Sequence, residues 1–160
     1  MLIYTRYLVY TRYKEYLMDQ FKVAATANIV INVLSARVWD ALTNPELVRQ
    51  YLYGAEIVSD WQKGSPIIFK GVWKEKPYED KGTIIEIEPG KMLKVTHYSP
   101  LSGLPDVPEN YHVVTYSLSE AGNKTTLTIT QENNRDQAEV NESEKTWNTI
   151  LSSMKTLLEQ

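Results

Sequence analysis

The sequence predicts an α+β domain in which a curved antiparallel sheet of about seven strands wraps around a long C-terminal helix, with two short helices after the first strand. Three observations lead to this fold: an amphipathic run at the C-terminus, a series of alternating segments separated by turn residues, and a helix-start signal near residue 45. Apolar residues at every second position are typical of half-buried strands, and apolar residues at every third or fourth position are typical of helices.

The C-terminal stretch, residues 137–160, carries the clearest helix pattern. Its large apolar side chains recur at steps of three, four and seven and therefore share one face: Trp147, Ile150, Leu151, Met154, Leu157 and Leu158. Asp136 offers an N-cap oxygen, and a carboxylate, Glu139, follows three residues later; Asn141 and Glu144 repeat this signal. Burial contributes roughly 1.5–3 kcal/mol for each such apolar side chain before entropy is subtracted. This face needs a partner, and the upstream chain supplies a sheet.

The first strand and the two short helices are predicted from local signals. Residues 21–31 alternate between apolar and polar side chains, which is typical of a long half-buried strand. Ser35 is expected to cap a helix over residues 36–42. The tripeptide Asn44-Pro45-Glu46 combines a cap, a proline at the first helical position and a carboxylate in the first turn, so it predicts a second helix that Gly54 ends.

From residue 55 onward, strands alternate with turn residues. Three hairpins are expected: residues 55–61 with 66–73, residues 81–88 with 91–98 around Pro89-Gly90, and residues 111–118 with 124–131. Successive hairpins form a meander, so the sheet is predicted to be antiparallel. For the strand over residues 91–98 two inward faces stay open, one with Leu93, Val95 and His97 and one with Met92, Thr96 and Tyr98.

The long connection over residues 99–110 (SPLSGLPDVPEN) differs from the short turns. Its three prolines and one glycine predict no regular structure, although Leu101, Leu104 and Val107 are apolar. A loop of this length is more often functional than a simple connection. Two interpretations remain open: a gate over a cavity, or a compact loop packed on its own leucines.

The composition excludes several classes of protein. The 160 residues include no cysteine, which excludes disulfides, thiolate nucleophiles and Cys-ligated zinc and fits a cytoplasmic protein. The net charge is −3 with acidic and basic residues mixed, whereas a nucleic-acid-binding protein usually presents a basic face. No apolar run approaches the roughly 20 residues of a membrane span, so no membrane-spanning helix is expected.

Residues 1–17 have a different pattern from the rest of the chain. Tyrosine recurs at every third position from Tyr4 to Tyr16, a period that fits neither a helix stripe nor a strand alternation. We therefore predict an N-terminal extension over residues 1–17 ahead of a single domain over residues 18–160. The alternative is a contact surface, because tyrosine and arginine are favoured at interfaces.

Residues 38–48 (VWDALTNPELV) resemble the signature of the activator of heat-shock protein 90 ATPase homologue family, which belongs to the START-like (SRPBCC) superfamily with the helix-grip fold. Residues 71–73 (GVW), 82–87 (GTIIEI) and 144–147 (EKTW) support the resemblance, which spans about residues 21–158. It implies a cavity between the sheet and the last helix. Single-domain relatives resemble ligand binders, stress-response proteins or polyketide-cyclase-like proteins, whereas the eukaryotic activators also carry a separate N-terminal domain that binds the chaperone.

Signatures of catalysis are sparse. The sequence contains no GxGxxG, GxxxxGK[ST], GxSxG or HExxH motif. His97 and His112 fall on adjacent expected strands beside the long loop. Two roles are open for them: a base in a closed cavity, or a histidine at the rim or surface. A two-histidine metal site lacks a nearby carboxylate, so no metal or cofactor is expected. Glu86 and Glu88 lie on one face of an expected strand, and Ile85 and Ile87 lie on the other face. The two glutamates form either a paired-carboxylate site or the solvent-facing side of the strand.

The aromatic residues fit either a solid core or the wall of an apolar pocket. They are spread over the expected sheet and the last helix: Trp61, Phe69, Trp73, Tyr98, Tyr111, Tyr116 and Trp147. A long, curved sheet that contacts its helix along one line tends to leave a void, which favours the pocket.

The sequence thus predicts a non-enzymatic protein that holds a small hydrophobic or amphipathic molecule between the sheet and the last helix. The expected wall consists of Trp73, His97, Trp147, Ile150, Leu151 and Met154, with residues 99–110 as the gate. One alternative, motivated by the resemblance, is a chaperone-associated protein that acts through its outer surface. The other is a cyclase-like or hydrolase-like enzyme that uses His97 or a tyrosine inside the cavity.

Overall fold

The computed structural model describes Arg12 and residues 24–160. The predicted extension, apart from Arg12, its boundary at residue 18 and the start of the predicted first strand at residues 21–23 lie outside the described residues. The elements in chain order are β1 (Ala25–Ile31), α2 (Ser35–Thr43), α3 (Pro45–Tyr51), β2 (Glu56–Ser59), β3 (Pro66–Trp73), β4 (Lys76–Glu88), β5 (Met92–His97), β6 (His112–Ala121), β7 (Lys124–Glu132) and α4 (Gln137–Leu158).

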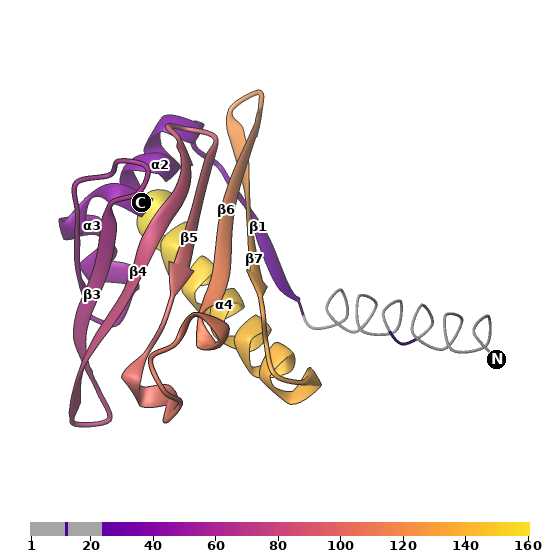
Figure 1. Ribbon diagram of the computed structural model, residues 1–160. Coiled ribbons are helices and arrows are strands. Elements are labelled where there is room, and N and C mark those ends of the chain that lie inside the picture. The colour runs from indigo at the N-terminus through magenta and orange to yellow at the C-terminus, as the bar shows by residue number, and fades with distance from the viewer. Residues whose placement is uncertain (1–11, 13–23) are drawn as a thin grey trace.

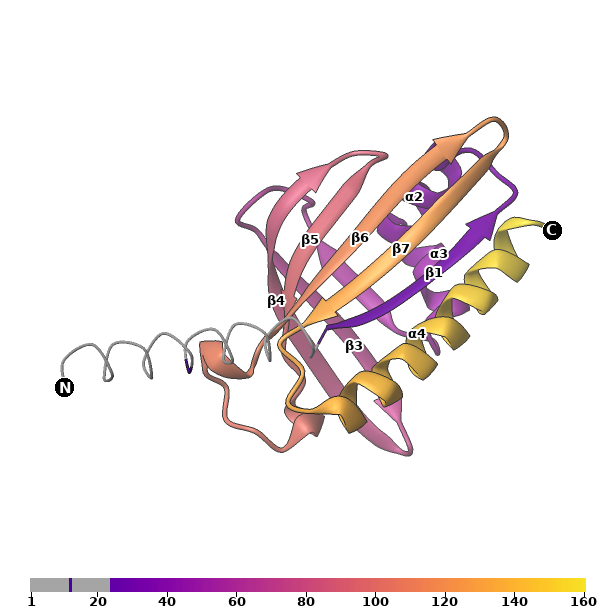
Figure 2. The same ribbon diagram turned by 90° about the vertical axis from the view of Figure 1, so that its right-hand side faces the viewer.

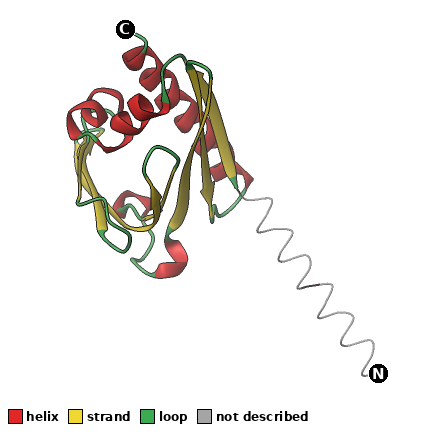
Figure 3. Ribbon diagram, turned by 90° about the horizontal axis from the view of Figure 1, so that it is seen from above, coloured by secondary structure: helices red, strands yellow, loops and turns green. Residues whose placement is uncertain are grey.

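The predicted α+β architecture is confirmed. Seven antiparallel strands form one sheet in the order β1-β7-β6-β5-β4-β3-β2. The sheet bends around α4, and α2 and α3 cover the end of the sheet opposite to the loop between β5 and β6 (Figure 1 and Figure 3). This arrangement is the helix-grip fold, and it places the inner face of the sheet opposite the apolar face of α4.

Helix α4 packs with the face that its periodicity predicts. Val140, Ile150, Leu151, Met154 and Leu158 are buried, and Trp147 and Leu157 pack partly buried against the same core. The predicted cap is confirmed, because the Asp136 carboxylate accepts a hydrogen bond from the backbone N–H of Glu139 at 2.8 Å.

Helix α4 also covers the free edge of β1, along which it runs (Figure 2). The Glu144 carboxylate accepts from the Thr26 backbone N–H at 3.1 Å, and the Lys155 ammonium donates to the Val30 carbonyl at 2.7 Å. The Glu159 carboxylate accepts from the Asn32 backbone N–H at 2.7 Å. An uncovered edge strand exposes such groups to other chains, so these contacts protect the edge.

The predicted cap of α2 is wrong. The helix begins at Ser35 itself, with Leu34 at the N-cap position and no side-chain cap. The Ser35 backbone N–H instead donates to the Glu120 carboxylate, which comes from the β6–β7 hairpin, at 2.7 Å. The start of α3 is confirmed, since the Asn44 side chain accepts from the Glu46 backbone N–H at 3.0 Å.

Strand β4 begins five residues earlier than predicted, at Lys76 instead of Lys81. It follows a two-residue turn, Lys74-Glu75, in which both residues have left-handed φ values of 48° and 65°. Such turns usually contain glycine or asparagine, so the sequence gives no local signal for this one. The longer strand brings Tyr78 and Asp80 into the sheet, opposite Gly71 and Phe69.

A β-bulge changes which side chains of β4 face the core. Ile84 pairs with Val95 and Glu86 pairs with Lys94, which leaves Ile85 as the extra residue. Ile84 is fully buried and Ile87 packs against the core, so the prediction that Ile85 and Ile87 share a face is wrong. Glu86 and Glu88 are both exposed, in agreement with the solvent-side interpretation.

The open question on β5 is resolved in favour of its Leu93 side. Leu93 and Val95 are buried in the core, and His97 continues the same face. Tyr98 is buried outside this core, where its ring stacks on Tyr111 and its hydroxyl donates to the Leu104 carbonyl at 2.7 Å. Residues 99–110 include two short 3-10 helices, Pro100–Ser102 and Pro108–Asn110, so the prediction of no regular structure there is wrong in part.

Candidate ligand-binding cavity

A cavity of about 520 Å³ lies between the inner face of the sheet and α4. This volume falls within the range of small-molecule sites in proteins. Most of its lining is apolar and comes from every layer of the fold: Leu42, Val48, Tyr51, Ile57, Ile67, Phe69, Leu93, Val95, Val114, Ile129, Trp147, Ile150 and Met154. The bent sheet therefore does not pack solidly on its helix. The pocket interpretation fits four of the seven aromatic residues, Phe69, Trp73, Tyr116 and Trp147, whereas Trp61, Tyr98 and Tyr111 do not line the cavity.

Exposed apolar side chains mark the mouth of the cavity. Tyr53, Trp73 and Leu101 all line it and are 51%, 43% and 46% exposed. The rings of Tyr53 and Trp73 meet edge to face, with 5.5 Å between their centroids. Leu101 comes from the long loop after β5, so this loop contributes directly to the mouth rather than packing only on itself.

One carboxylate helps to fix the loop to the sheet. Asp106 forms an ion pair with Lys81 of β4 and accepts a hydrogen bond from the Tyr111 hydroxyl at 2.6 Å. The hydrogen bond from Lys81, followed by the one from Tyr111, lowers the pKa of Asp106. These contacts are on the outside of the protein, where solvent weakens them.

Five of the six residues predicted as the cavity wall do line the cavity: Trp73, His97, Trp147, Ile150 and Met154. The sixth, Leu151, is fully buried in the core but is not among the lining residues. The apolar face of α4 is wider than the cavity, so periodicity alone does not separate lining residues from packing residues. The role of these residues in ligand binding stays a prediction.

One polar group of the cavity has all its hydrogen bonds within the protein. The indole N–H of Trp147 donates to Gln131 Oε1 at 2.9 Å. The Gln131 amide N–H₂ in turn donates to Asn134 Oδ1 at 2.7 Å and to Ser143 Oγ at 3.0 Å. Tyr116 meets the Trp147 ring edge to face, and burial raises the pKa of its phenol. No sequence signal selects Gln131, because nothing in a threonine-rich strand marks its single glutamine as buried.

A second polar group, His97 with Asp80, is not fully paired. His97 Nε2 lies 3.0 Å from Asp80 Oδ2, and the His97 ring meets Phe69 edge to face. Asp80 Oδ1 is buried, and no hydrogen-bond partner for it exists among the described residues. Burial raises the pKa of the neighbouring Tyr78 phenol, and the negative charge of Asp80 raises it further.

Gly82 permits the close approach of β4 and β5 beside this pair. A Cβ atom at Gly82 would lie 1.7 Å from the Thr96 carbonyl oxygen. Only glycine therefore fits at this position, two residues after Asp80 and opposite the peptide that precedes His97. Asp80 is not among the predicted site residues, because the expected strand begins at residue 81.

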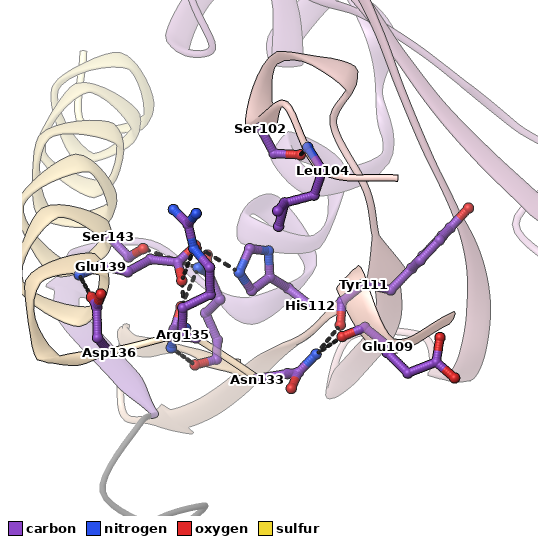
Figure 4. Close-up of polar contacts among 12 residues, drawn as sticks. Ser102, Leu104, Glu109, Tyr111, His112, Asn133, Arg135, Asp136, Glu139 and Ser143 are labelled. Atoms are coloured by element: carbon purple, nitrogen blue, oxygen red, sulfur yellow. Dashed lines mark hydrogen bonds and ion pairs between the residues drawn. The ribbon is translucent and has the colours of Figure 1, made fainter. Parts of the chain in front are cut away.

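The second histidine belongs to a separate polar cluster between β6 and α4 (Figure 4). His112 is paired directly with His97 in the β5–β6 register, yet its Nε2 lies 3.1 Å from Glu139 Oε1. The other oxygen of Glu139 accepts from the backbone N–H of Arg135 and from its guanidinium Nε at 3.3 Å. Burial lowers the pKa of His112, and the charge of Glu139 offsets this only in part. His112 does not line the cavity.

Neither a metal site nor a membrane-spanning helix is found within the described residues. Within residues 24–160, no three histidine, cysteine or acidic side chains are grouped so that they could hold a metal ion. In the same part of the chain, no helix has the length and apolar character needed to cross a membrane.

A curved sheet gripping one long helix around an apolar cavity defines the START-like (SRPBCC) class of proteins. The sequence profile described as "Activator of Hsp90 ATPase homolog 1-like protein" matches residues 32–159. The chain belongs to this family, as its resemblance over residues 38–48 predicts. No curated protein matches the sequence.

Solved structures agree with this assignment. A protein of Cytophaga hutchinsonii is 46% identical over 85% of this chain and 93% of its own, with a TM-score of 0.75. The Aha1 dimer from Colwellia psychrerythraea is 19% identical over 86% of this chain and 96% of its own, with a TM-score of 0.68. CalU16 from Micromonospora echinospora is also 19% identical, over 84% of this chain and 75% of its own, with a TM-score of 0.68. The two distant structures share the fold alone.

Proposed function

We propose that this protein is a non-enzymatic carrier or sensor that holds a small hydrophobic or amphipathic molecule in the cavity between the sheet and α4. The observation that supports this proposal is the apolar cavity of about 520 Å³, which lies beside the hydrophobic core. An apolar space of this size offers a ligand both dispersion contacts and apolar surface to bury. A ligand would also cover Trp73 and Leu101, whose apolar surfaces are now partly in water.

The expected affinity is moderate. A ligand of about 15 non-hydrogen atoms that gains roughly 0.3–0.5 kcal/mol per atom reaches about 4.5–7.5 kcal/mol. This corresponds to a Kd between about 3 and 500 µM, so binding assays need ligand concentrations in that range. Met154 suits such a site because its flexible thioether side chain adapts to ligands of different shape.

The test is a thermal-shift screen with apolar and amphipathic molecules, followed by calorimetry on those that stabilise the protein. Met154→Trp should weaken binding, because the larger side chain occupies part of the cavity that Met154 lines. Leu157→Trp is the matched control, since Leu157 is on the same helix but outside the lining, and it should bind as the unmodified protein does. The absence of any stabilisation across a broad lipid and aromatic library would contradict the proposal.

A second candidate function, association with a chaperone through the outer surface, is favoured by membership of this family. Purified chaperone would be tested for binding to the protein and for stimulation of its ATPase activity. Met154→Trp separates the two functions, because Met154 is buried and a larger side chain there leaves the outer surface unchanged. If chaperone binding survives this substitution while ligand binding is weakened, the two functions are at different sites. If the unmodified protein neither binds the chaperone nor stimulates its ATPase activity, this candidate function is removed.

A further inference from the structure

Asp80 carries a buried oxygen that nothing in the described chain satisfies. Its side chain is 15% exposed, its Oδ2 is engaged by His97, and its Oδ1 is buried without a partner. Buried polar atoms in folded proteins are normally hydrogen-bonded, and leaving one unpaired is costly. Asp80 also lines the cavity, together with His97 and Tyr78. The residue that carries the unpaired oxygen therefore belongs to the wall of the proposed ligand site.

The chemistry of a carboxylate decides what the missing partner must be. An ionised carboxylate only accepts hydrogen bonds, so beside an ionised Asp80 it is His97 Nε2 that donates to Oδ2. The second oxygen, Oδ1, needs a donor of its own. We propose that the ligand carries a hydrogen-bond-donating head group, a hydroxyl or an ammonium, which binds Asp80 Oδ1 while its apolar part occupies the rest of the cavity. This inference rests on the proposed function and names the class of ligand.

The charges around the cavity agree with this choice. Of the described lining residues, Asp80 and Glu142 are acidic and Lys145 is basic. Lys145 is exposed on α4, where water screens its charge, so it does not neutralise the more buried Asp80. A carboxylate or phosphate head group would be repelled at Asp80, whereas an ammonium would be attracted.

The position of Asp80 also sets the orientation of the ligand. His97 is the last residue of β5, at the end of the sheet that faces the long loop (Figure 1). Leu42 and Val48 line the cavity from α2 and α3, which cover the opposite end. The head group would therefore lie near the loop, and the apolar part would extend towards the two short helices. The Gln131–Trp147 pair needs no ligand, because its hydrogen bonds are already made.

Four probes with the same eight-carbon chain test the inference by calorimetry near neutral pH: octan-1-ol, octylammonium, octanoate and 1-methoxyoctane. The alcohol and the ammonium should bind the unmodified protein at least about tenfold more tightly than the ether and the carboxylate, since only they donate to Asp80. Tighter binding of octylammonium than of octanol would identify an amine as the head group, and the reverse order would identify a hydroxyl; both orders support the inference.

Asp80→Asn should remove this preference and improve the relative binding of the ether and the carboxylate, because the amide presents a donor of its own. Glu139→Gln is the matched control, since it makes the same chemical change in a histidine–carboxylate pair outside the cavity and should leave the ranking unchanged.

Equal affinity for all four probes, or a preference that persists in Asp80→Asn, would overturn the inference and leave the cavity as a binding site. If none of the four binds the unmodified protein, the inference is overturned, whereas the proposed function is contradicted only if the broad lipid and aromatic library also yields no stabilising ligand. The ranking in the unmodified protein is informative even if a variant does not fold.

Discussion

The two histidines of this protein lie opposite each other on neighbouring strands, each beside a carboxylate, yet they occupy different kinds of site. His97 Nε2 is 3.0 Å from Asp80 and His112 Nε2 is 3.1 Å from Glu139. The exposed fractions of the side chains are also similar, 31% and 15% in the first pair and 21% and 19% in the second. Neither the nitrogen–oxygen distance nor the exposed fraction of the side chains distinguishes the two histidine–carboxylate pairs.

The difference between the pairs is the number of partners of the carboxylate. Glu139 uses both oxygens, one for His112 and one for Arg135, and thereby connects β6 to the start of α4 (Figure 4). Asp80 uses only one oxygen within the described chain, and its other oxygen is buried beside the cavity. A saturated pair stabilises the fold, whereas a pair with a missing partner indicates a site for something else.

The largest expected effect is on the saturated pair. Glu139→Ala should lower the free energy of unfolding by about 2 kcal/mol, because it leaves the half-buried His112 and the Arg135 backbone N–H without their acceptor. The melting temperature should fall by roughly 4–8 °C for a domain of this size. Calorimetric unfolding measures both. A change below about 0.5 kcal/mol would show that this cluster is not structural.

The pH dependence of stability should follow His112. Burial holds its pKa below the ordinary value of about 6.5, so the unfolded chain takes up a proton at a higher pH than the folded protein does. The free energy of unfolding should be unaffected by this group above pH 6.5 and should fall as the pH drops from there through the lowered pKa. His112→Gln keeps a donor for Glu139 but does not titrate. Denaturant unfolding of both proteins across this range should show the loss in the unmodified protein only; parallel curves would contradict the assignment.

A substitution at Asp80 should change the free energy of unfolding less than Glu139→Ala does, and without a comparable loss of stability. Asp80→Asn keeps an oxygen to accept from His97 and replaces the unpaired oxygen with an amide N–H₂. It should change the free energy of unfolding by less than about 1 kcal/mol, or increase it, because a poorly paired buried charge is removed. Denaturant unfolding without ligand measures this. A loss as large as that in Glu139→Ala would mean that Asp80 serves the fold.

Local signals in the sequence predict most of this fold. The period of α4, the Asn44-Pro45 start of α3 and the Pro89-Gly90 turn each act over a few residues, so each appears directly in the sequence. The same period selects Ile150 and Met154, which line the cavity, but also Leu151, which only packs.

The polar part of the site depends on register, which local signals do not determine. Asp80 reaches the cavity because the turn Lys74-Glu75, without glycine or asparagine, adds five residues to β4. The bulge at Ile85 then changes the inward face of that strand. A shift of one residue moves every later side chain to the other face of the sheet. The strand predicted from the apolar residues within 81–88 therefore does not include the Asp80 carboxylate.

The smallest effect on stability concerns the loop that connects the two histidine strands. Asp106 holds this loop through Lys81 and Tyr111, and both charged side chains of the ion pair are about half exposed. Asp106→Asn should therefore leave the melting temperature almost unchanged, since exposed pairs contribute little. It should instead raise the rates of ligand association and dissociation together, because Leu101 on the same loop lines the cavity mouth. Stopped-flow tryptophan fluorescence with octan-1-ol would measure both rates. Unchanged rates would show that ligands enter past Tyr53 and Trp73, on the side of the mouth that the loop does not form.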